Sequence, residues 1–329
     1  MRETRLDESY DQLPHSGSCI LDRSGRVPEP ETMKPLQAGA AIALVIFGTT
    51  ALHSESARPQ VSKPTAREII AAIQHQIPIS WDEPTVDTFK AGNPDTPVNG
   101  IAVTMMATMD VLQRAAAHGD NLIITHEPTF FDHLDTPQGI KEDDAVWKEK
   151  REFIEQHGLV VWRFHDHWHS RTPDGILTGM TSVLGWTHFQ NPENPHLYTL
   201  PATTLRKLAA DVAKKLDQPI LRIVGDPAMP VKGVALAPGA SGFARQVAAL
   251  ELDGVDVLLA GESREWETVE YAADAVSQGR KKALILIGHV PSEQAGMEDC
   301  AKWLKTFVKG LRIEFVATQQ PFWTVPAPR

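Results

Sequence analysis

The sequence predicts an α/β protein in which two related strand-helix-strand lobes pack around a central metal site. Three observations support this prediction. Short apolar strands alternate with amphipathic helices, the order of these elements repeats once along the chain, and histidines and carboxylates follow strands in both halves. Such alternation is typical of layered α/β folds with largely parallel strand pairs, in which ligands bind beyond the strand ends.

The composition is that of a globular protein and excludes several other classes. Of the 329 residues, 42% are hydrophobic and 22% are charged, which excludes a disordered, collagen-like or coiled-coil chain. The net charge of −10 argues against a nucleic-acid partner, because nucleic acids are bound by basic surfaces. The two cysteines, Cys19 and Cys300, are too few for a disulfide framework or a thiolate metal site.

The N-terminal residues 1–56 are expected to lie outside the folded domain. Residues 1–32 are polar, and we expect translation to start after them, at the methionine that follows. A short basic region, the apolar stretch Ala40–Gly48 and a group of small residues then predict a signal peptide over 33–56 and export of the protein. An N-terminal membrane anchor is the alternative, although the apolar run is shorter than the ~20 residues of a membrane span. The mature chain is expected to contain no stable span.

In the first half of the chain, from about 62 to 190, each element has a local signal. Thr65 and Glu68 form a capping box that starts an amphipathic helix. Residues 82–99 and 170–202 are rich in loop-forming residues, with a helix expected across 175–184. Between these segments we expect strands at Gly100–Thr104, Asn121–Thr125 and Leu159–Phe164, and helices at Met109–Ala117 and 142–157.

After a predicted helix at Thr204–Leu216 the pattern restarts, from about 230 to 320. We expect strands at Gly233–Ala237, Val255–Ala260, Ala283–Gly288 and Arg312–Ala317, and helices at Ala244–Leu252, 265–277 and Cys300–Gly310. The first three strands of the two halves match in order and spacing, and His165 and His289 follow the third strand of each half. The expected α/β domain therefore spans 62–320, with a segment connecting its two lobes.

Six of the thirteen histidines lie between residues 126 and 169, and three clusters of histidine and carboxylate each follow an apolar strand. A single histidine after a strand is usually only a hydrogen-bonding loop residue, but three such clusters favour one shared metal site. Two clusters contain a four-residue spacing that places both side chains on one helix face. The clusters are His126-Glu127, then His165-Asp166-His167 with His169, and finally His289 with Glu293. We expect no chemistry from His75, His118, His133, His157, His188 and His196.

Imidazole and carboxylate ligands without thiolates suit Zn, Fe, Mn, Co or Ni. About three histidines and two carboxylates exceed the needs of one tetrahedral ion, so we expect two divalent ions per chain. The sequence contains no glycine-rich phosphate loop of the GxGxxG or GxxxxGK[ST] type and no GxSxG nucleophile elbow.

At these residues the sequence resembles the Nif-three-like family of dinuclear-metal proteins, which includes GTP cyclohydrolase type-two homologues. The block at 109–128 is similar to the family's strand that ends in His-His-Pro, and Gly288-His289 with Glu293 is similar to its Gly-His-x-x-x-Glu motif. The strand before His165, followed by the turn at 173–176, also resembles the family. This resemblance covers 62–320. It implies a two-lobed α/β fold, a dinuclear metal site between the lobes and a ring-like hexamer.

The resemblance also implies which residues bind the metals: His126, His289 and Glu293 match family ligands. Glu127 stands where the family has a second histidine, and His169 stands where it has an aspartate. These two differences compensate each other, because three histidines and two carboxylates remain.

Three other residues of the second cluster stay open as alternatives. Asp166 is a candidate ligand in place of His169, and His165 and His167 are candidates for a supporting position behind the ligands. His165 is also retained as a candidate ligand.

By resemblance, the expected function is that of a dinuclear metal-dependent hydrolase with cyclohydrolase-like chemistry on an unidentified small molecule. Glu127 and Glu293 are the candidate catalytic residues, because a carboxylate that is not fully used by a metal can transfer a proton. The main alternative is a non-catalytic metal-binding or metal-handling assembly protein that uses the same residues. A third alternative is an interaction module for a protein partner. Export would argue against a nucleotide substrate from the cytosol.

Overall fold

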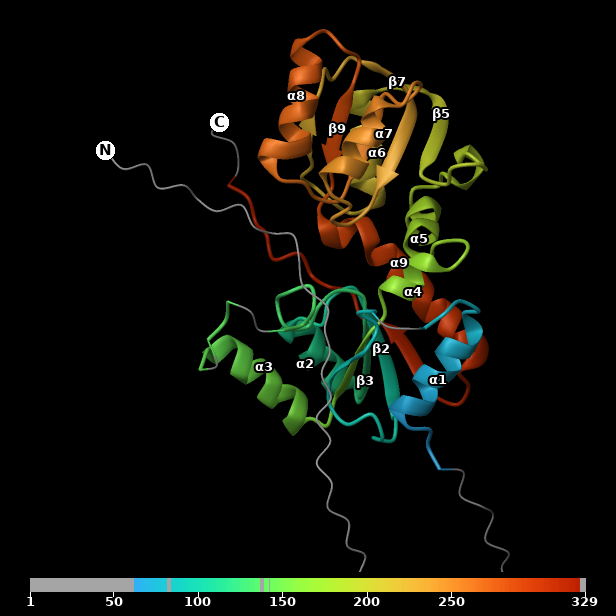
Figure 1. Ribbon diagram of the computed structural model, residues 1–329, viewed down its shortest axis with the longest axis vertical. Coiled ribbons are helices and arrows are strands. Elements are labelled where there is room, and N and C mark those ends of the chain that lie inside the picture. Colours follow the sequence, from blue (N-terminus) through green and yellow to red (C-terminus); the bar gives the residue numbers. More distant parts are fainter. Residues whose placement is uncertain (1–61, 82–83, 137–138, 142, 326–329) are drawn as a thin grey trace, which may run out of the picture. The chain divides into compact units, whose positions relative to one another are not determined.

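Two five-stranded sheets, each with helices on both faces, organise the protein (Figure 1). The computed structural model describes residues 62–81, 84–136, 139–141 and 143–325, which belong to a single compact unit. The N-terminal residues 1–56, with the predicted signal peptide, lie outside the described residues. No helix in the described part of the chain is both long enough and apolar enough to span a membrane.

The first sheet has three central parallel strands that are buried along their whole length. Its strand order is β1 (Phe89–Ala91), β4 (Val160–Arg163), β3 (Leu122–Thr125), β2 (Gly100–Thr104) and β10 (Arg312–Phe315). Strand β10 is also parallel to its neighbour β2, whereas the edge strand β1 is antiparallel to β4.

Alternate side chains of this sheet enter two different cores, as the two-residue period of a strand requires. Side chains such as Ile101 and Ile124 pack with α1 (Ala66–Gln76) and α9 (His289–Phe307). Their neighbours, such as Ala102 and Ile123, pack with α2 (Met109–His118) and α3 (Ala145–Gln156) on the opposite face. Figure 1 shows α2 and α3 on one side of β2 and β3, and α1 on the other. Coverage of both faces explains why these strands contain no polar alternation.

The second sheet repeats this plan with β5 (Leu197–Thr204), β7 (Pro230–Ala237), β8 (Val257–Ala260), β9 (Ala283–Leu286) and β6 (Arg222–Val224), in that order. Strands β7, β8 and β9 are parallel, and both edge strands are antiparallel. The helices α5 (Gly175–Val183) and α6 (Leu205–Lys215) cover one face. The other face is covered by α7 (Phe243–Glu251) and by α8 (Glu270–Ser277), which a π-helical turn at Glu265–Val269 precedes.

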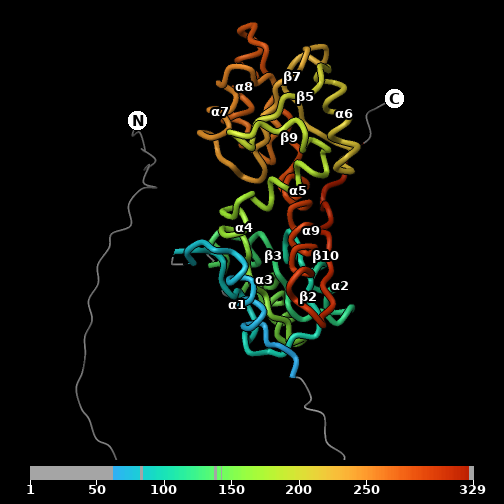
Figure 2. Tube along the Cα trace, turned by 90° about the vertical axis from the view of Figure 1, so that its right-hand side faces the viewer, coloured from blue at the N-terminus to red at the C-terminus, as the bar shows by residue number. Residues whose placement is uncertain are grey.

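Two long-range connections join the sheets. The chain leaves the first sheet through the short helix α4 (Asp166–Ser170) and α5, and a 3-10 turn at Thr187–Phe189 precedes β5. It returns through α9, which packs against α5 and then against β2 and β10. Figure 2 shows α9 beside β2 and β10. The last strand of the chain therefore completes the first sheet.

The predicted α/β class with two related lobes is confirmed, and several element predictions need correction. The helix expected at Cys300–Gly310 is longer and begins at His289. Pro291 does not interrupt it, because this proline lies in the first turn, where a missing N–H breaks no helical hydrogen bond. The two sheets are mixed, since the antiparallel edge strands β1, β5 and β6 border the parallel centres. Two of these edge strands lie in segments expected to be loops, β1 within 82–99 and most of β5 within 170–202.

Candidate metal centre

The first half of the chain contributes four histidine and carboxylate side chains from two neighbouring strand ends. His126 and Glu127 directly follow β3, and His165 lies just beyond β4. Since β3 and β4 are adjacent and parallel, their carboxyl ends meet at one edge of the sheet. The helix α4 adds His169, whose backbone N–H donates to the carbonyl of His165 one turn earlier.

The second half contributes His289 and Glu293 from the start of α9. Gly288 before this helix has a φ of +93°, a conformation that glycine adopts far more readily than other residues. This glycine lets the chain turn from β9 directly into α9. The helical spacing of four then places His289 and Glu293 side by side.

The Glu127 carboxylate faces two imidazoles and is held from behind by an arginine. Its Oε1 lies 3.0 Å from Nε2 of His289 and 3.9 Å from Nε2 of His165. Its Oε2 lies 3.3 Å from the guanidinium of Arg163, a side chain with no solvent exposure. Arg163 also donates to the backbone carbonyls of His126 and His133, so it fixes the loop that carries Glu127.

The Glu293 carboxylate faces three imidazoles. Its Oε2 lies 3.2 Å from Nε2 of His289 and 3.6 Å from Nε2 of His126. Its Oε1 lies 4.0 Å from Nε2 of His169. Glu127, Glu293 and the four histidines around them thus form one continuous cluster, in which His289 lies next to both carboxylates. We refer to His126, Glu127, His165, His169, His289 and Glu293 as the His/Glu cluster.

All four histidines of the His/Glu cluster direct Nε2 toward the carboxylates and place Nδ1 next to an oxygen outside the cluster. These oxygens are the carbonyl of Phe164 for His126 (3.1 Å), Asp166 for His165 (2.9 Å), Asp174 for His169 (3.0 Å) and Glu262 for His289 (3.3 Å). A carbonyl or ionised carboxylate can only accept a hydrogen bond, so Nδ1 is the protonated nitrogen. In neutral His126, His165 and His169, Nε2 then presents a lone pair to the centre of the cluster. This arrangement is the usual one for metal-binding histidines. His289 has a carboxylate oxygen beside both ring nitrogens, so it would offer a lone pair to a metal only after Nε2 loses its proton.

Two buried atoms show that the His/Glu cluster fits a cation. Nε2 of His126 and Oε2 of Glu293 are buried and have no hydrogen-bond partner within the described parts of the chain. Both atoms are electron-pair donors, and they face each other at 3.6 Å. Burying such groups without a partner is costly, and a cation between them would satisfy both. The donor atoms of His126, His165 and His169 lie within 4.8 Å of one another, as do those of His126, Glu127 and Glu293.

The electrostatics of the cluster favour an ionised Glu127 and a neutral His126, which are the forms in which both side chains can bind a metal. Burial opposes protonation of His289, but the adjacent carboxylates of Glu127, Glu262 and Glu293 raise its pKa to about 12. Burial raises the pKa of Glu127, yet the hydrogen bond from His289 and the nearby imidazoles lower it overall, to about 2. Burial and the neighbouring imidazoles hold the pKa of His126 well below its usual value.

The remaining predicted residues, Asp166 and His167, lie outside the centre of the cluster. The Asp166 carboxylate accepts hydrogen bonds from the Thr85 hydroxyl, the Val86 N–H and Nδ1 of His165. It therefore supports His165 from behind. His167 points elsewhere, because its Nδ1 lies 2.7 Å from Oδ2 of Asp87 and its ring stacks on Trp81.

Three groups that support the cluster, Asp174, Glu262 and Arg163, were not predicted from the sequence. Asp174 accepts from His169 and also caps α5, and its position before a glycine and an apolar run was a capping signal. Glu262 occupies the position in the second half that Glu127 occupies in the first, so the internal repeat carried a signal for it. Nothing in the sequence marked Arg163. His133 and His196, which were expected to have no role, line the cavity next to the cluster.

The comparisons with known proteins agree with this fold. A family model described as Duf34/NIF3 (NGG1p interacting factor 3) matches residues 64–321. No curated protein matches the sequence. Similar solved structures include Staphylococcus aureus protein SA1388, with a TM-score of 0.60, 19% identity, and coverage of 80% of this chain and 99% of that chain. A Bacillus cereus protein related to NIF3 is similar with a TM-score of 0.62 and 16% identity, and the match covers 80% of this chain and 99% of that chain.

Reduced HcgD from Methanocaldococcus jannaschii is also similar, with a TM-score of 0.55, 15% identity, and coverage of 77% of this chain and 97% of that chain. At such low sequence identities these structures support a shared fold and carry no conclusion about activity. The family model, by contrast, spans both sheets and every member of the His/Glu cluster. The expected family resemblance is confirmed: the chain belongs to the DUF34/NIF3 family.

Proposed function

We propose that this protein is a metal-dependent hydrolase that acts on a small molecule at a pair of divalent transition-metal ions. One observation carries the proposal: four imidazole Nε2 atoms and two carboxylates converge, and among the described residues the buried pair His126 Nε2 and Glu293 Oε2 makes no hydrogen bond. Six donor groups exceed the four positions of one tetrahedral ion, which supports two ions. A set of imidazoles and carboxylates suits Zn, Fe, Mn, Co or Ni.

The six residues of the His/Glu cluster would hold the metals. When bound, such a pair of ions supplies Lewis-acid activation of a water molecule and of the bond to be cleaved. Glu127 and Glu293 are the residues proposed to accept the proton of the attacking water. Arg163 would keep Glu127 oriented, since it holds Oε2 and leaves Oε1 directed toward the imidazoles.

Access to the cluster supports hydrolysis over metal storage or transfer. Five of the six cluster residues line a cavity of about 930 Å³, which is within the size range of small-molecule sites. A site that is closed by protein ligands on all sides would favour a structural or storage role. The nearest chemistry by family resemblance is cyclohydrolase-like ring opening, and the substrate is addressed below.

Metal content tests the proposal directly. We expect elemental analysis to find about two transition-metal ions per chain in the wild-type protein after loading with Zn, Mn or Fe. The double variant His126→Ala with His289→Ala should lose them. The matched control is His75→Ala with His157→Ala, which removes two exposed histidines from helix ends and should keep the wild-type metal content.

Each outcome has a defined meaning. Absence of bound metal after loading would contradict the metallohydrolase proposal. Two bound ions, together with no hydrolysis of a broad panel of amides, esters, phosphoesters and ring substrates, would favour the alternative of a metal-handling protein. Hydrolysis that depends on the added metal and disappears in the double variant would support the proposal.

We also propose, from the family resemblance, that the protein assembles as a homo-oligomer, specifically a hexamer, and that it is exported. Light scattering should then give a mass about six times that of one mature chain, and the mature protein should start near residue 57. A monomeric mass would contradict the first proposal, and an uncleaved N-terminus in the source cell would contradict cleavage of a signal peptide.

A further inference from the structure

The cavity beside the His/Glu cluster has two chemically different sides. One side consists of the cluster and its supporting carboxylates, including Glu127, Asp166, Asp174 and Glu293. The other side comes from elements of the second sheet, mainly the end of β7 and the helix α7. A ligand of this cavity would therefore touch the metal-binding side with one end and the second sheet with the other.

The side formed by the second sheet is mainly aliphatic, with Asn194, His196 and Ser241 as polar exceptions beside Arg245. One face of α7 and its C-terminal end contribute Ala248, Ala249 and Leu252. Together with Arg245 they follow the spacing 0, 3, 4 and 7, which places all four on the same side of a helix. Alanines from the end of β7 and the next loop extend this surface, namely Ala235, Ala237 and Ala240. Among the described lining residues there is no Phe, Tyr or Trp, so the contact that α7 and the end of β7 offer is aliphatic.

Arg245 is the only lysine or arginine among the described residues that line this cavity. Its side chain is exposed, and no carboxylate of the described chain lies within ion-pair distance of it. The nearest neighbours on its helix face are the alanines, which cannot neutralise it. The wall thus carries one uncompensated guanidinium within an apolar surface. A guanidinium binds carboxylates and phosphates with two parallel hydrogen bonds, so it is suited to an anionic ligand.

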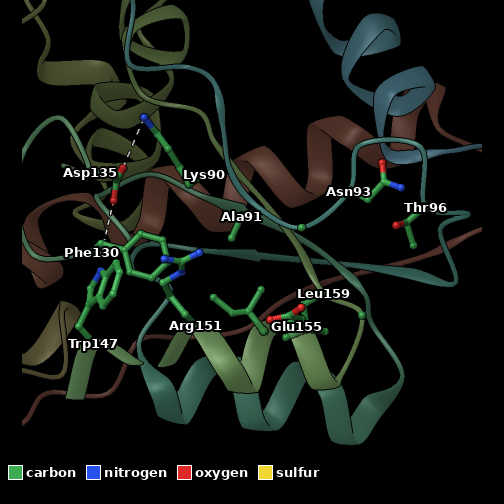
Figure 3. A pocket seen from close by; sticks show the side chains of 13 residues that line it. Lys90, Ala91, Asn93, Thr96, Phe130, Asp135, Trp147, Arg151, Glu155 and Leu159 are labelled. Atoms are coloured by element: carbon green, nitrogen blue, oxygen red, sulfur yellow. Dashed lines mark hydrogen bonds and ion pairs between the residues drawn. The ribbon is translucent and has the colours of Figure 1, made fainter. Parts of the chain in front are cut away.

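A second cavity, of about 630 Å³, provides a comparison within the same chain (Figure 3). Its cations already have partners in the wall. Lys90 lies 3.5 Å from the buried carboxylate of Asp135, and the guanidinium of Arg151 stacks on Trp147 at 4.7 Å. Figure 3 shows both pairs lining the hollow. An uncompensated cation is therefore a feature of the cavity beside the His/Glu cluster.

We propose that Arg245 binds the terminal carboxylate or phosphate of an aliphatic substrate whose other end reaches the His/Glu cluster. The chain between the two ends would lie on the alanine surface of α7 and β7. This inference rests on the proposed hydrolase function and adds the substrate class: a small amphipathic acid with a hydrolysable group at the end opposite to the anion.

Matched acids of different length provide the test. Calorimetric titration of zinc-loaded protein would compare α,ω-dicarboxylates of four to nine carbons with the monocarboxylates of the same length. One carboxylate of each probe can reach the metal side, so the second carboxylate reports Arg245. We expect at least one length at which the dicarboxylate binds about tenfold more tightly. This advantage should disappear in Arg245→Gln and persist in Arg151→Gln, which makes the same change of charge at the other cavity.

The outcomes separate this inference from the proposed function. Zinc content is measured first, and a protein without zinc contradicts the proposed function and this inference with it. If zinc binds but the dicarboxylates have no advantage at any length, or keep it in Arg245→Gln, only the role of Arg245 is contradicted. Because Arg245 is exposed, its substitution should leave the circular dichroism spectrum and the zinc content unchanged.

Discussion

Gly179 of α5 and Gly296 of α9 contact each other backbone to backbone. A methyl group added to Gly179 would lie 2.5 Å from the Cα and N atoms of Gly296, and one added to Gly296 would lie 2.5 Å from Cα of Ile176. The two helices therefore approach more closely than any side chain would allow. This crossing matters for the site, because α5 is capped by Asp174, the partner of His169, and α9 begins at His289.

Substitution of Gly179 should disturb the site without removing a ligand. In Gly179→Ala the methyl group would force α5 and α9 apart, which should lower the free energy of unfolding by about 1–3 kcal/mol. Zinc affinity, measured by competition with a chelator, should fall by on the order of tenfold, because the ligands from the two halves would lose their spacing. Ser182→Ala, at an exposed position of the same helix, is the control. Unchanged zinc affinity in a destabilised Gly179→Ala protein would contradict this coupling.

The dual role of Asp174 can be separated by one conservative substitution. Its Oδ1 accepts from the N–H groups of Ile176 and Leu177, and its Oδ2 accepts from Nδ1 of His169. Asparagine is as good an N-cap as aspartate, so the helix should keep the amide oxygen and turn the NH₂ group toward His169. His169 would then have to protonate Nε2, which cannot bind a metal while it carries a proton.

We therefore expect Asp174→Asn to change the free energy of unfolding by less than about 0.5 kcal/mol and to reduce metal affinity about 10- to 100-fold. Chemical denaturation measures the first value and chelator competition the second. The control is Asp226→Asn, which changes an exposed aspartate in a turn away from the cluster. Equal loss of stability and metal affinity would show that Asp174 acts only through the helix.

Zinc should stabilise the folded protein through the His/Glu cluster. A ligand that binds only the native state adds about 2.7 kcal/mol of stability at 100 times its dissociation constant, which corresponds to several degrees in melting temperature. Calcium should have little effect, because it prefers oxygen ligands and the cluster is dominated by imidazoles. Thermal melts with zinc, calcium and a chelator provide the measurement, and His126→Ala should abolish the effect of zinc. A shift of the same size in that variant would place the stabilising zinc elsewhere.

A carboxylate far from the cluster should give the protein a measurable acid dependence. Asp120 is fully buried, and its Oδ1 accepts from the guanidinium of Arg312 at 2.8 Å. Burial and the neighbouring carboxylate of Glu314 raise the pKa of Asp120 from 3.8 to about 6, which Arg312 opposes. His118 pairs with Glu314 from the other side. The folded state therefore holds a proton on Asp120 more tightly than the unfolded state does.

The sign of the effect follows from this difference. The stabilising contribution of protonated Asp120 is complete below pH 3.8 and is lost as the pH rises through about 6. The opposite shift of Glu314 offsets part of it, so we expect the contribution to be about 1–2 kcal/mol. Urea unfolding of chelator-treated protein at several pH values between 4 and 7 should show this loss in the wild type. It should be absent in Asp120→Asn and present in Asp253→Asn, an exposed control; equal pH profiles for all three would refute the assignment.

Much of the fold was predictable because its signals are local. The caps at Thr65 and Thr204 and the glycine after α2 mark helix ends within a few residues of where they lie. The central strands read as uninterrupted apolar runs because both of their faces are covered by helices. Of the four edge strands only β10 was predicted. The edge strands β1 and β6 have three residues each and no buried face to impose a pattern, and most of β5 lies in a segment rich in loop-forming residues.

The candidate site was predictable in part for the same reason. Ligand-type residues at the ends of parallel strands meet at one sheet edge, so the sequence alone could group His126, His165 and His289 as candidate ligands. The choice within the second cluster depends on the direction of α4. That helix turns His165 and His169 toward Glu127 and Glu293, and it leaves His167 against Trp81.

The sequence by itself determined the α/β class, the two related halves and the residue types available to a metal, because each depends on spacing within a short stretch of chain. Only the tertiary structure decided that β10 joins the first sheet, that α5 and α9 cross at two glycines, and that Arg163 and Glu262 support the cluster. These relationships join residues that are far apart in the sequence. They arise from packing between elements, and no local pattern of residues encodes them.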